Sequence, residues 1–341
     1  MEKKLKKIIK VLLIIFLILL IIFVIKTFLT KQKLKDKGYS ENQIQKFYDF
    51  SFDINVILEY DVCDNINEIL NDDFNKDNLE SYLKKCTEEE PIVETKDPFV
   101  AKLEQEKYYI PSNLERYMAY NDGVKTTTEI VTDVNCNIDR EFYTNITKAD
   151  TSKGNLILVN KYYYIDETYQ PVDPTVLQLN KYTYWSNSVL SKEAHTAFTN
   201  MVDDAKELGY SLIDTSAYRT YEYQSYLYNK YLKENGLEWT LKSSAKPGHS
   251  EHHTGLATDI VKVGVSMYDF ESTDEFNWIK DNAHKYGFIL RYPEGKEYLT
   301  GYKYEPWHYR YVGKDVATYI YENDIVFEEY YAYFCEYKKS C

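Results

Sequence analysis

Two short stretches of the sequence carry side chains that could bind a metal. The first runs from Pro247 to Asp259 and contains His252, and the second contains His308. Zinc accepts imidazole nitrogen and carboxylate oxygen, and a catalytic zinc takes three protein ligands and leaves one position open for water. His252 and Asp259 alone are a weak signal, but His308 supplies the missing third ligand. The sequence therefore predicts a zinc site that is assembled from two separate segments.

The second stretch also offers a proton acceptor. Glu305 stands three residues before His308, and a carboxylate beside a zinc site can remove the proton of the bound water. If residues 256–262 form a strand, alternate side chains face the core and Asp259 faces the other side. We therefore expect Asp259 to point into a cleft, with Glu305 as a candidate general base.

Taken together, the two stretches resemble the VanY-type D-alanyl-D-alanine carboxypeptidases, a family of zinc peptidases. The family signature S-x-H-x-x-G-x-A-x-D reads SEHHTGLATD at 250–259, and E-x-W-H reads EPWH at 305–308. The likeness extends over residues 150–315 and includes SAYRTYEYQ at 216–224 and YGFILRYPEGKE at 286–297. It does not cover the part of the chain before residue 90.

The resemblance implies a role for each matching residue. His252, Asp259 and His308 fall on the zinc ligands of the family, and Glu305 falls on its general base. Arg219 falls on the arginine that contacts the substrate and helps to stabilise the developing oxyanion. The implied reaction removes the C-terminal D-alanine from peptidoglycan stem peptides, by attack of a zinc-activated water whose proton Glu305 takes.

The resemblance leaves the bond that is cut undecided: it is either D,D in pentapeptides or L,D in tetrapeptides. Gln224 and Ser250 match further cleft positions of the family and are expected to bind substrate. The alternatives are a catalytically silent peptidoglycan-binding protein, against which Glu305 argues, and a cell-wall endopeptidase. Four other histidines are not expected to be ligands, namely His195, His249, His253 and His284.

The distribution of charge argues against a nucleic-acid partner. Residues 1–37 contain ten lysines and two acidic residues, whereas the remaining residues contain 31 basic and 52 acidic residues. Such an acidic body repels phosphate backbones and lacks the basic surface on which nucleic-acid binding depends.

An apolar run near the N-terminus predicts a membrane anchor. Residues 11–25 contain no polar side chain, and the run extends from Ile8 to Leu29 if Lys10 and Lys26 reach the interface. Lysines before the run favour a cytoplasmic N-terminus. Because no small-residue cleavage site follows, a retained single-pass anchor in the cell membrane is favoured over a removed signal peptide. The catalytic domain would then be extracellular, where peptidoglycan is available.

Composition divides the chain into four parts. We expect a basic tip and transmembrane helix at 1–37, a small helical module at 38–90, a linker and strand-rich segment at 91–149, and the carboxypeptidase domain at 150–341. Acidic residues beside Pro91 mark the linker, and Ser40 fits a capping box at the start of the module.

Apolar spacing predicts the elements that must position the site. Helices are expected at 191–208, 221–235 and 276–286, each followed by a glycine. Strands are expected at 129–131, 156–159, 211–213, 256–264, 288–292 and 307–312. Helices mixed with short strands indicate an α+β fold, and the family resemblance implies a small mixed or antiparallel sheet with flanking helices around a zinc peptidase cleft.

The five cysteines lack the spacing of a zinc site. Cys63 and Cys86 could form a disulfide within the helical module in an oxidising exterior, although one sequence cannot establish connectivity. An odd number of cysteines leaves at least one thiol unpaired. The oligomeric state is not predictable from these patterns.

Overall fold

The structure, a computed structural model, describes residues 2–63, 65–70, 74–88 and 97–341. The expected linker at Glu88–Pro91 lies almost wholly outside the described residues. The chain divides into two compact units, Met1–Lys96 and Asp97–Cys341, which are described separately below. The boundaries predicted at 37, 90 and 149 stay predictions.

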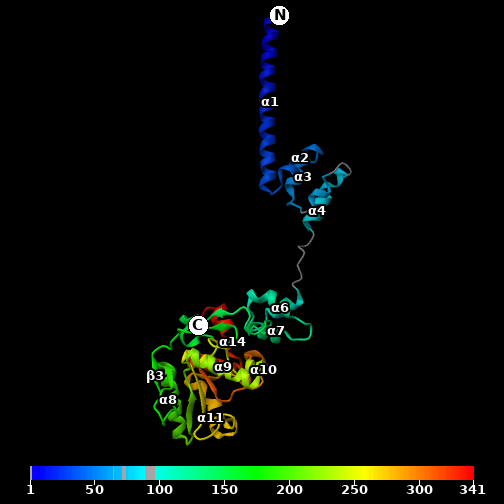
Figure 1. Cartoon of the computed structure of the whole chain (residues 1–341). Coiled ribbons are helices and arrows are strands. Elements are labelled where there is room, and N and C mark those ends of the chain that lie inside the picture. The colour runs from blue at the N-terminus through cyan, green and yellow to red at the C-terminus, as the bar shows by residue number, and fades with distance from the viewer. Residues whose placement is uncertain (1, 64, 71–73, 89–96) are drawn as a thin grey trace. The chain divides into compact units, whose positions relative to one another are not determined.

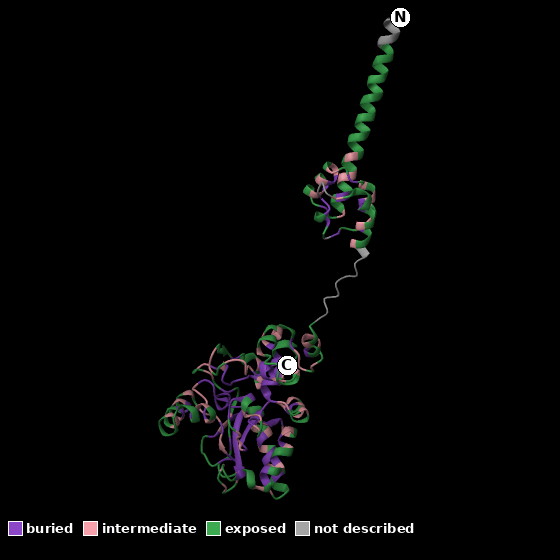
Figure 2. Cartoon of the chain, turned by 90° about the vertical axis from the view of Figure 1, so that its right-hand side faces the viewer, coloured by how far each residue is buried: buried purple, intermediate pink, exposed green. Residues whose placement is uncertain are grey.

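The first unit begins with a long apolar helix, α1 (Glu2–Asp36). Its segment Lys7–Asp36 contains an 18-residue stretch with a mean hydropathy of 3.6 and is long and apolar enough to cross a membrane. Its apolar residues between Ile8 and Leu29 are exposed, whereas Leu34 near its end is buried (Figure 2). An apolar helix without protein partners along most of its length is typical of a segment that lies in lipid.

The rest of the first unit is helical. It contains α2 (Glu41–Asp49), α3 (Ile54–Glu59) and α4 (Leu79–Glu88), with short 3₁₀ turns between α3 and α4. The expected capping box is present, because Ser40 and Gln43 exchange hydrogen bonds. Phe47, Ile57 and Leu83 are fully buried in its small core. Cys63 and Cys86 form a disulfide across it.

The second unit is built around a four-stranded sheet in the order β5-β6-β8-β7, with every neighbouring pair antiparallel. The strands are β5 (Leu212–Ser216), β6 (Ala257–Lys262), β8 (His308–Tyr311) and β7 (Phe288–Leu290). The register places Asp259 opposite His308 on one side and opposite Ser216 on the other. Two residues that are distant in sequence thus become cross-strand neighbours.

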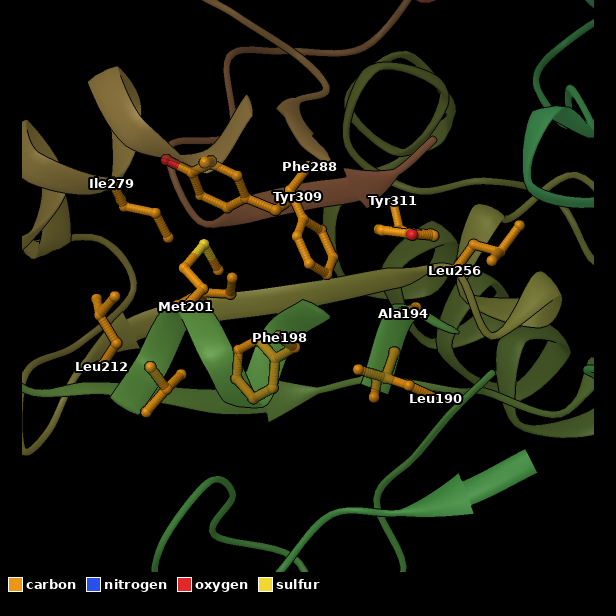
Figure 3. Packing of buried hydrophobic residues seen from close by; sticks show 14 of the residues in the cluster. Leu190, Ala194, Phe198, Met201, Leu212, Leu256, Ile279, Phe288, Tyr309 and Tyr311 are labelled. Carbon is orange, nitrogen blue, oxygen red and sulfur yellow. The ribbon is translucent and has the colours of Figure 1, made fainter. Parts of the chain in front are cut away.

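Helix α8 (Lys192–Glu207) supplies much of the core beneath this sheet. Its apolar residues recur at helical spacing, and Phe198 and Met201 are fully buried against Leu212 and Tyr309 from the strands (Figure 3). Helix α11 (Asp274–Asn282) adds Ile279 to the same core and continues into a 3₁₀ turn that ends at a glycine. Burial of these side chains holds the sheet rigid, which keeps the paired positions of β6 and β8 in place.

The remaining elements surround this core (Figure 1). The helices are α5 (Pro98–Leu103), α6 (Leu114–Tyr120), α7 (Thr127–Asn135), α9 (Tyr221–Asn235), α10 (Leu237–Ser243), α12 (Glu297–Thr300), α13 (Lys314–Asn323) and α14 (Phe327–Tyr330), followed by a π-helical segment at Tyr331–Tyr337. Two small sheets pair β1 (Thr147–Lys148) with β2 (Tyr163–Tyr164), and β3 (Pro174–Val176) with β4 (Val189–Ser191). The α+β prediction is confirmed.

Two strand predictions are wrong. Residues 129–131 belong to helix α7, because Thr126 and Glu129 form a capping box, and Ile130 and Val134 are buried at a spacing of one helical turn. Residues 156–159 form no strand, since a 3₁₀ helix runs from Thr151 to Leu156 and the chain then continues as irregular buried backbone. Apart from the two-residue strand β1, the regular structure between residues 97 and 149 is helical rather than rich in strands.

Candidate metal centre

Three predicted ligands converge on one point. His252 lies in the 3₁₀ helix η5 (Glu251–Thr254), while Asp259 and His308 face each other across β6 and β8. Asp259 Oδ1 lies 3.4 Å from His252 Nε2 and 3.1 Å from His308 Nδ1, and the three candidate ligand atoms all lie within 4.8 Å of one another. This spacing and this set of two nitrogens and one oxygen fit a tetrahedral zinc ion with ligand distances of about 2.0–2.2 Å.

The His252 ring is oriented from behind by the backbone. Its Nδ1 lies 2.7 Å from the carbonyl oxygen of Ala217, so Nδ1–H donates there and the lone pair of Nε2 faces the cluster. Burial, together with the nearby charge of Arg219, lowers the pKa of His252 to about 4. The imidazole is therefore neutral at physiological pH, which is the form that binds a metal.

His308 is held between two carboxylates. Burial acts to lower its pKa, but hydrogen bonds to Asp259 and Glu251 outweigh burial and raise the pKa of His308 to about 9. Its Nε2 lies 3.4 Å from Glu251 Oε2, while Nδ1 faces Asp259. A metal that binds at Nδ1 must therefore displace a proton from this ring.

Glu305 lies at the edge of the cluster. Its Oε2 is 3.8 Å from His308 Nδ1, and its side chain remains 17% exposed. Burial raises the pKa of Glu305 to about 7, with the charges of Asp259 and Glu251 adding to the rise. A carboxylate with a pKa near the working pH is well suited to exchange a proton with a reacting group.

Arg219 precedes helix α9 and reaches back to the cluster. Its Nη2 donates to Asp259 Oδ2 at 2.7 Å, and its Nε donates to the hydroxyl of Ser216 at 2.8 Å. The Arg219 side chain is 21% exposed and lines the cleft. It therefore both neutralises Asp259 and presents positive charge beside the metal centre.

All seven predicted site residues line one cleft with a cavity of 330 Å³. Gln224 is buried there; its Nε2 donates to the carbonyl of Ala245 at 2.8 Å, while its Oε1 has no hydrogen-bond partner among the described residues. Ser250 lies in the same wall, and Tyr292 and Trp307 belong to the aromatic part of the lining. A larger cavity of 720 Å³ elsewhere in the unit contains none of the seven.

Sequence reasoning missed a buried ion cluster behind His308. Glu251 is completely buried, and its Oε1 accepts from both Arg291 and Arg310 at 2.8 Å. Arg291 in turn pairs with Glu328 near the C-terminus. The sequence did offer one sign of this cluster. The expected strands 288–292 and 307–312 each carry an arginine, Arg291 and Arg310, among residues expected to be buried.

The second unit matches known proteins. The family model VanY, described as D-alanyl-D-alanine carboxypeptidase, matches residues 187–314, which include every predicted site residue. YodJ of Bacillus subtilis (strain 168) is 38% identical over 205 residues, which cover 57% of this chain and 75% of that relative. Among solved structures, the LdcB LD-carboxypeptidase is 38% identical, covers 57% of this chain and 92% of its own, and has a TM-score of 0.52.

A vancomycin-resistance D,D-pentapeptidase, a VanY mutant solved in complex with Zn(II), is 33% identical. The match covers 52% of this chain and 98% of the other, with a TM-score of 0.45. The matches to the family model, to YodJ and to LdcB show that the chain belongs to the VanY family of D-alanyl-D-alanine carboxypeptidases, a family of zinc peptidases.

Proposed function

We propose that this chain removes the C-terminal D-alanine from peptidoglycan stem peptides, either D,D from pentapeptides or L,D from tetrapeptides. The observation that carries the proposal is the buried cluster of His252, Asp259 and His308, which opens onto a cleft beside Glu305. Relatives of both kinds are known, since LdcB is an LD-carboxypeptidase and the VanY mutant is a D,D-pentapeptidase. Glu305 argues against a silent binding protein, which has no use for a proton acceptor with a pKa near neutrality.

Each cleft residue has a distinct task in this proposal. Zinc, held by the two histidines and Asp259, would supply a Lewis acid for the scissile carbonyl and for a water molecule. Glu305 Oε2 takes the proton of the attacking water and returns it to the leaving D-alanine nitrogen. Arg219 offers fixed positive charge to the terminal carboxylate or to the developing oxyanion.

Two further residues of the cleft wall would hold the peptide. The unpartnered Oε1 of Gln224 is a buried acceptor, and leaving it empty costs free energy that a substrate N–H would recover. Ser250 belongs to the same lining as that glutamine and the metal ligands. Both are proposed to bind the stem peptide rather than to take part in proton transfer.

The location of the reaction forms part of the proposal. Helix α1 would anchor the protein as a single-pass membrane protein, with the lysine-rich N-terminus in the cytoplasm. The second unit would then lie outside the membrane, where stem peptides are available. Its acidic character makes nucleic acid an unsuitable partner.

The test compares the full chain with Glu305→Gln in detergent micelles. Both proteins are expected to bind about one zinc per chain, because the ligands are unchanged. The wild type should release free D-alanine from a pentapeptide or tetrapeptide stem, while the variant should lose about 10²–10⁴-fold in turnover. Mass spectrometry of both stems, with metal analysis of both proteins, measures each quantity.

The outcomes separate the parts of this proposal. Equal release of D-alanine by wild type and variant would remove Glu305 from its role as general base. Release from neither stem by the zinc-loaded wild type would contradict the carboxypeptidase assignment. Cleavage of a cross-linked dimer in place of both stems would favour the endopeptidase alternative.

A further inference from the structure

We propose that Glu251 is a positioning residue for the metal centre, because it fixes the His308 imidazole with Nδ1 toward the zinc. The inference rests on the proposed zinc site and deepens it. Glu251 occupies a variable position of the family signature, beside the ligand His252 on the same 3₁₀ turn. A single turn would thus supply one ligand and orient another.

The two carboxylate oxygens of Glu251 face different partners. Oε2 lies 3.4 Å from His308 Nε2, at the long end of hydrogen bonding, while Oε1 accepts from Arg291 Nε and Arg310 Nη1 at 2.8 Å. A carboxylate only accepts hydrogen bonds, and a neutral imidazole carries one N–H. A metal bound at Nδ1 would leave the one proton of the neutral imidazole on Nε2, where Glu251 Oε2 is placed to accept it.

The imidazole has little freedom to turn away from this arrangement. Its ring stacks on Tyr292 with centroids 4.8 Å apart, and the His252 ring meets it edge-on at 4.8 Å. The polar group that faces Nε2 is Glu251, while Nδ1 faces Asp259 and, at 3.8 Å, Glu305. The aromatic contacts set the plane of the ring, and Glu251 selects which nitrogen carries the proton.

Glu251 is itself anchored on both sides. The Arg291 and Arg310 side chains are completely buried. Arg291 also forms a two-point pair with Glu328, at 2.9 and 2.5 Å, and Arg310 donates to the carbonyl oxygens of Asn155 and Ile157. Two buried cations therefore meet two buried carboxylates, which fixes the Glu251 side chain in one rotamer.

The geometry of strand β8 explains why Glu251 contacts both the ligand His308 and Arg310. His308 and Arg310 are two residues apart on β8, so their side chains leave the same face of the sheet. Glu251 lies across that face and contacts both. A mutation of Glu251 would then affect the metal ligand and the arginine at once, which requires a control that affects the arginines alone.

Glu328 provides that control. It pairs with Arg291 and accepts from Asn160, and no contact joins it to His308 among the contacts of the described residues. The test measures zinc dissociation constants of the full chain in detergent micelles for wild type, Glu251→Gln and Glu328→Gln, by competition with a chelator. Both variants remove one buried carboxylate beside Arg291, so both lose thermal stability.

Only Glu251→Gln is expected to bind zinc more weakly, by about 10–100-fold, and to shift the visible spectrum of the cobalt-substituted protein. Unchanged zinc affinity and spectrum in Glu251→Gln would overturn the proposal. Equal weakening in both variants would also overturn it, because the acid would then serve only to neutralise the arginines. Neither measurement depends on turnover. A negative result would therefore contradict the role of Glu251 without contradicting the proposed reaction.

A second measurement needs no variant and covers the case in which Glu251→Gln does not fold. Imidazole ¹⁵N spectra of the zinc-loaded wild type should show the proton of His308 on Nε2 and the metal on Nδ1. His252 serves as an internal comparison, since its Nδ1 donates to Ala217 and its Nε2 should bind the metal. Zinc on Nε2 of His308 would contradict the role of Glu251.

Discussion

At the scale of single residues, three carboxylates lie around one metal centre, and their partners differ. Asp259 is buried, but His252 and Arg219 outweigh burial and hold its pKa well below the usual range. Glu251 is likewise kept ionised by Arg291 and Arg310. Glu305 forms no ion pair with an arginine among the described contacts, so burial raises its pKa instead. This difference matches the proposed roles, in which the first acid binds the metal, the second positions a ligand and the third transfers a proton.

The raised pKa of Glu305 leads to a pH prediction. A general base acts in its deprotonated form, so kcat/KM should fall as the pH is lowered through the pKa of Glu305. This pKa lies at about 7 against an ordinary 4.5, and a cation bound nearby lowers it. We therefore expect the acid limb of a pH profile to have its midpoint between these two values.

The measurement is kcat/KM for D-alanine release from pH 4 to 8, with the zinc content determined at each pH. The zinc content separates protonation of Glu305 from loss of metal. Constant activity across the whole range would contradict the assignment of Glu305 as the base.

His252, Asp259, His308 and Glu305 could be predicted from their types and spacing, whereas Arg219, Gln224 and Ser250 were expected because they match positions of the family. Zinc binds only a few kinds of donor atom, and two short motifs contain all the donors that this site needs. The role of Glu251 could not be predicted in this way. It depends on arginines 40 and 59 residues farther along the chain, and only the pairing of β6, β7 and β8 brings those side chains together.

At the scale of elements, the structure shows which apolar patterns can be interpreted locally. The helix at 221–235 was predicted correctly, because it is long and bounded by a glycine. The strand prediction at 129–131 is wrong, since two β-branched residues after Glu129 contain too little periodicity to outweigh a helix cap. Short α14 was not predicted at all, although it supplies Glu328.

Helix α8 leads to a stability prediction. Phe198 is fully buried between this helix and the sheet, so Phe198→Ala should lower the free energy of unfolding by about 3–5 kcal/mol through lost burial and a cavity. Leu208, at the end of the same helix, is 64% exposed. Leu208→Ala should therefore change the free energy of unfolding by less than about 0.5 kcal/mol.

Tryptophan fluorescence during urea unfolding measures both variants in the full chain. All four tryptophans lie in the second unit, at positions 185, 239, 278 and 307, so the signal reports on that unit alone. A similar loss of stability in the two variants would show that α8 does not pack on the sheet as described.

At the scale of the whole molecule, the chain combines an apolar helix with an acidic catalytic unit. Deletion of residues 2–37 should move the protein from the membrane fraction to the soluble fraction, because α1 is the one candidate span among the described residues. Replacement of residues 11–25 by fifteen leucines is the matched control and should keep the protein in the membrane. Sedimentation after an alkaline wash measures the distribution.

Retention of the truncated protein in the membrane would show that another surface holds it there. Protease treatment of intact cells tests the orientation in the same strains. Digestion of the second unit from outside is expected, and full protection would place the catalytic unit on the cytoplasmic side.

The pairing of Arg291 with Glu328 has a consequence for the order in which the protein matures during synthesis. All zinc ligands have been made once residue 308 leaves the ribosome, but the acid that shares the charge of Arg291 comes twenty residues later. Until then, two arginines compete for the single carboxylate of Glu251. The charge of Arg291 is thus fully paired only when the last helices dock, so the buried ion cluster behind His308 is complete only after residue 328 has been made.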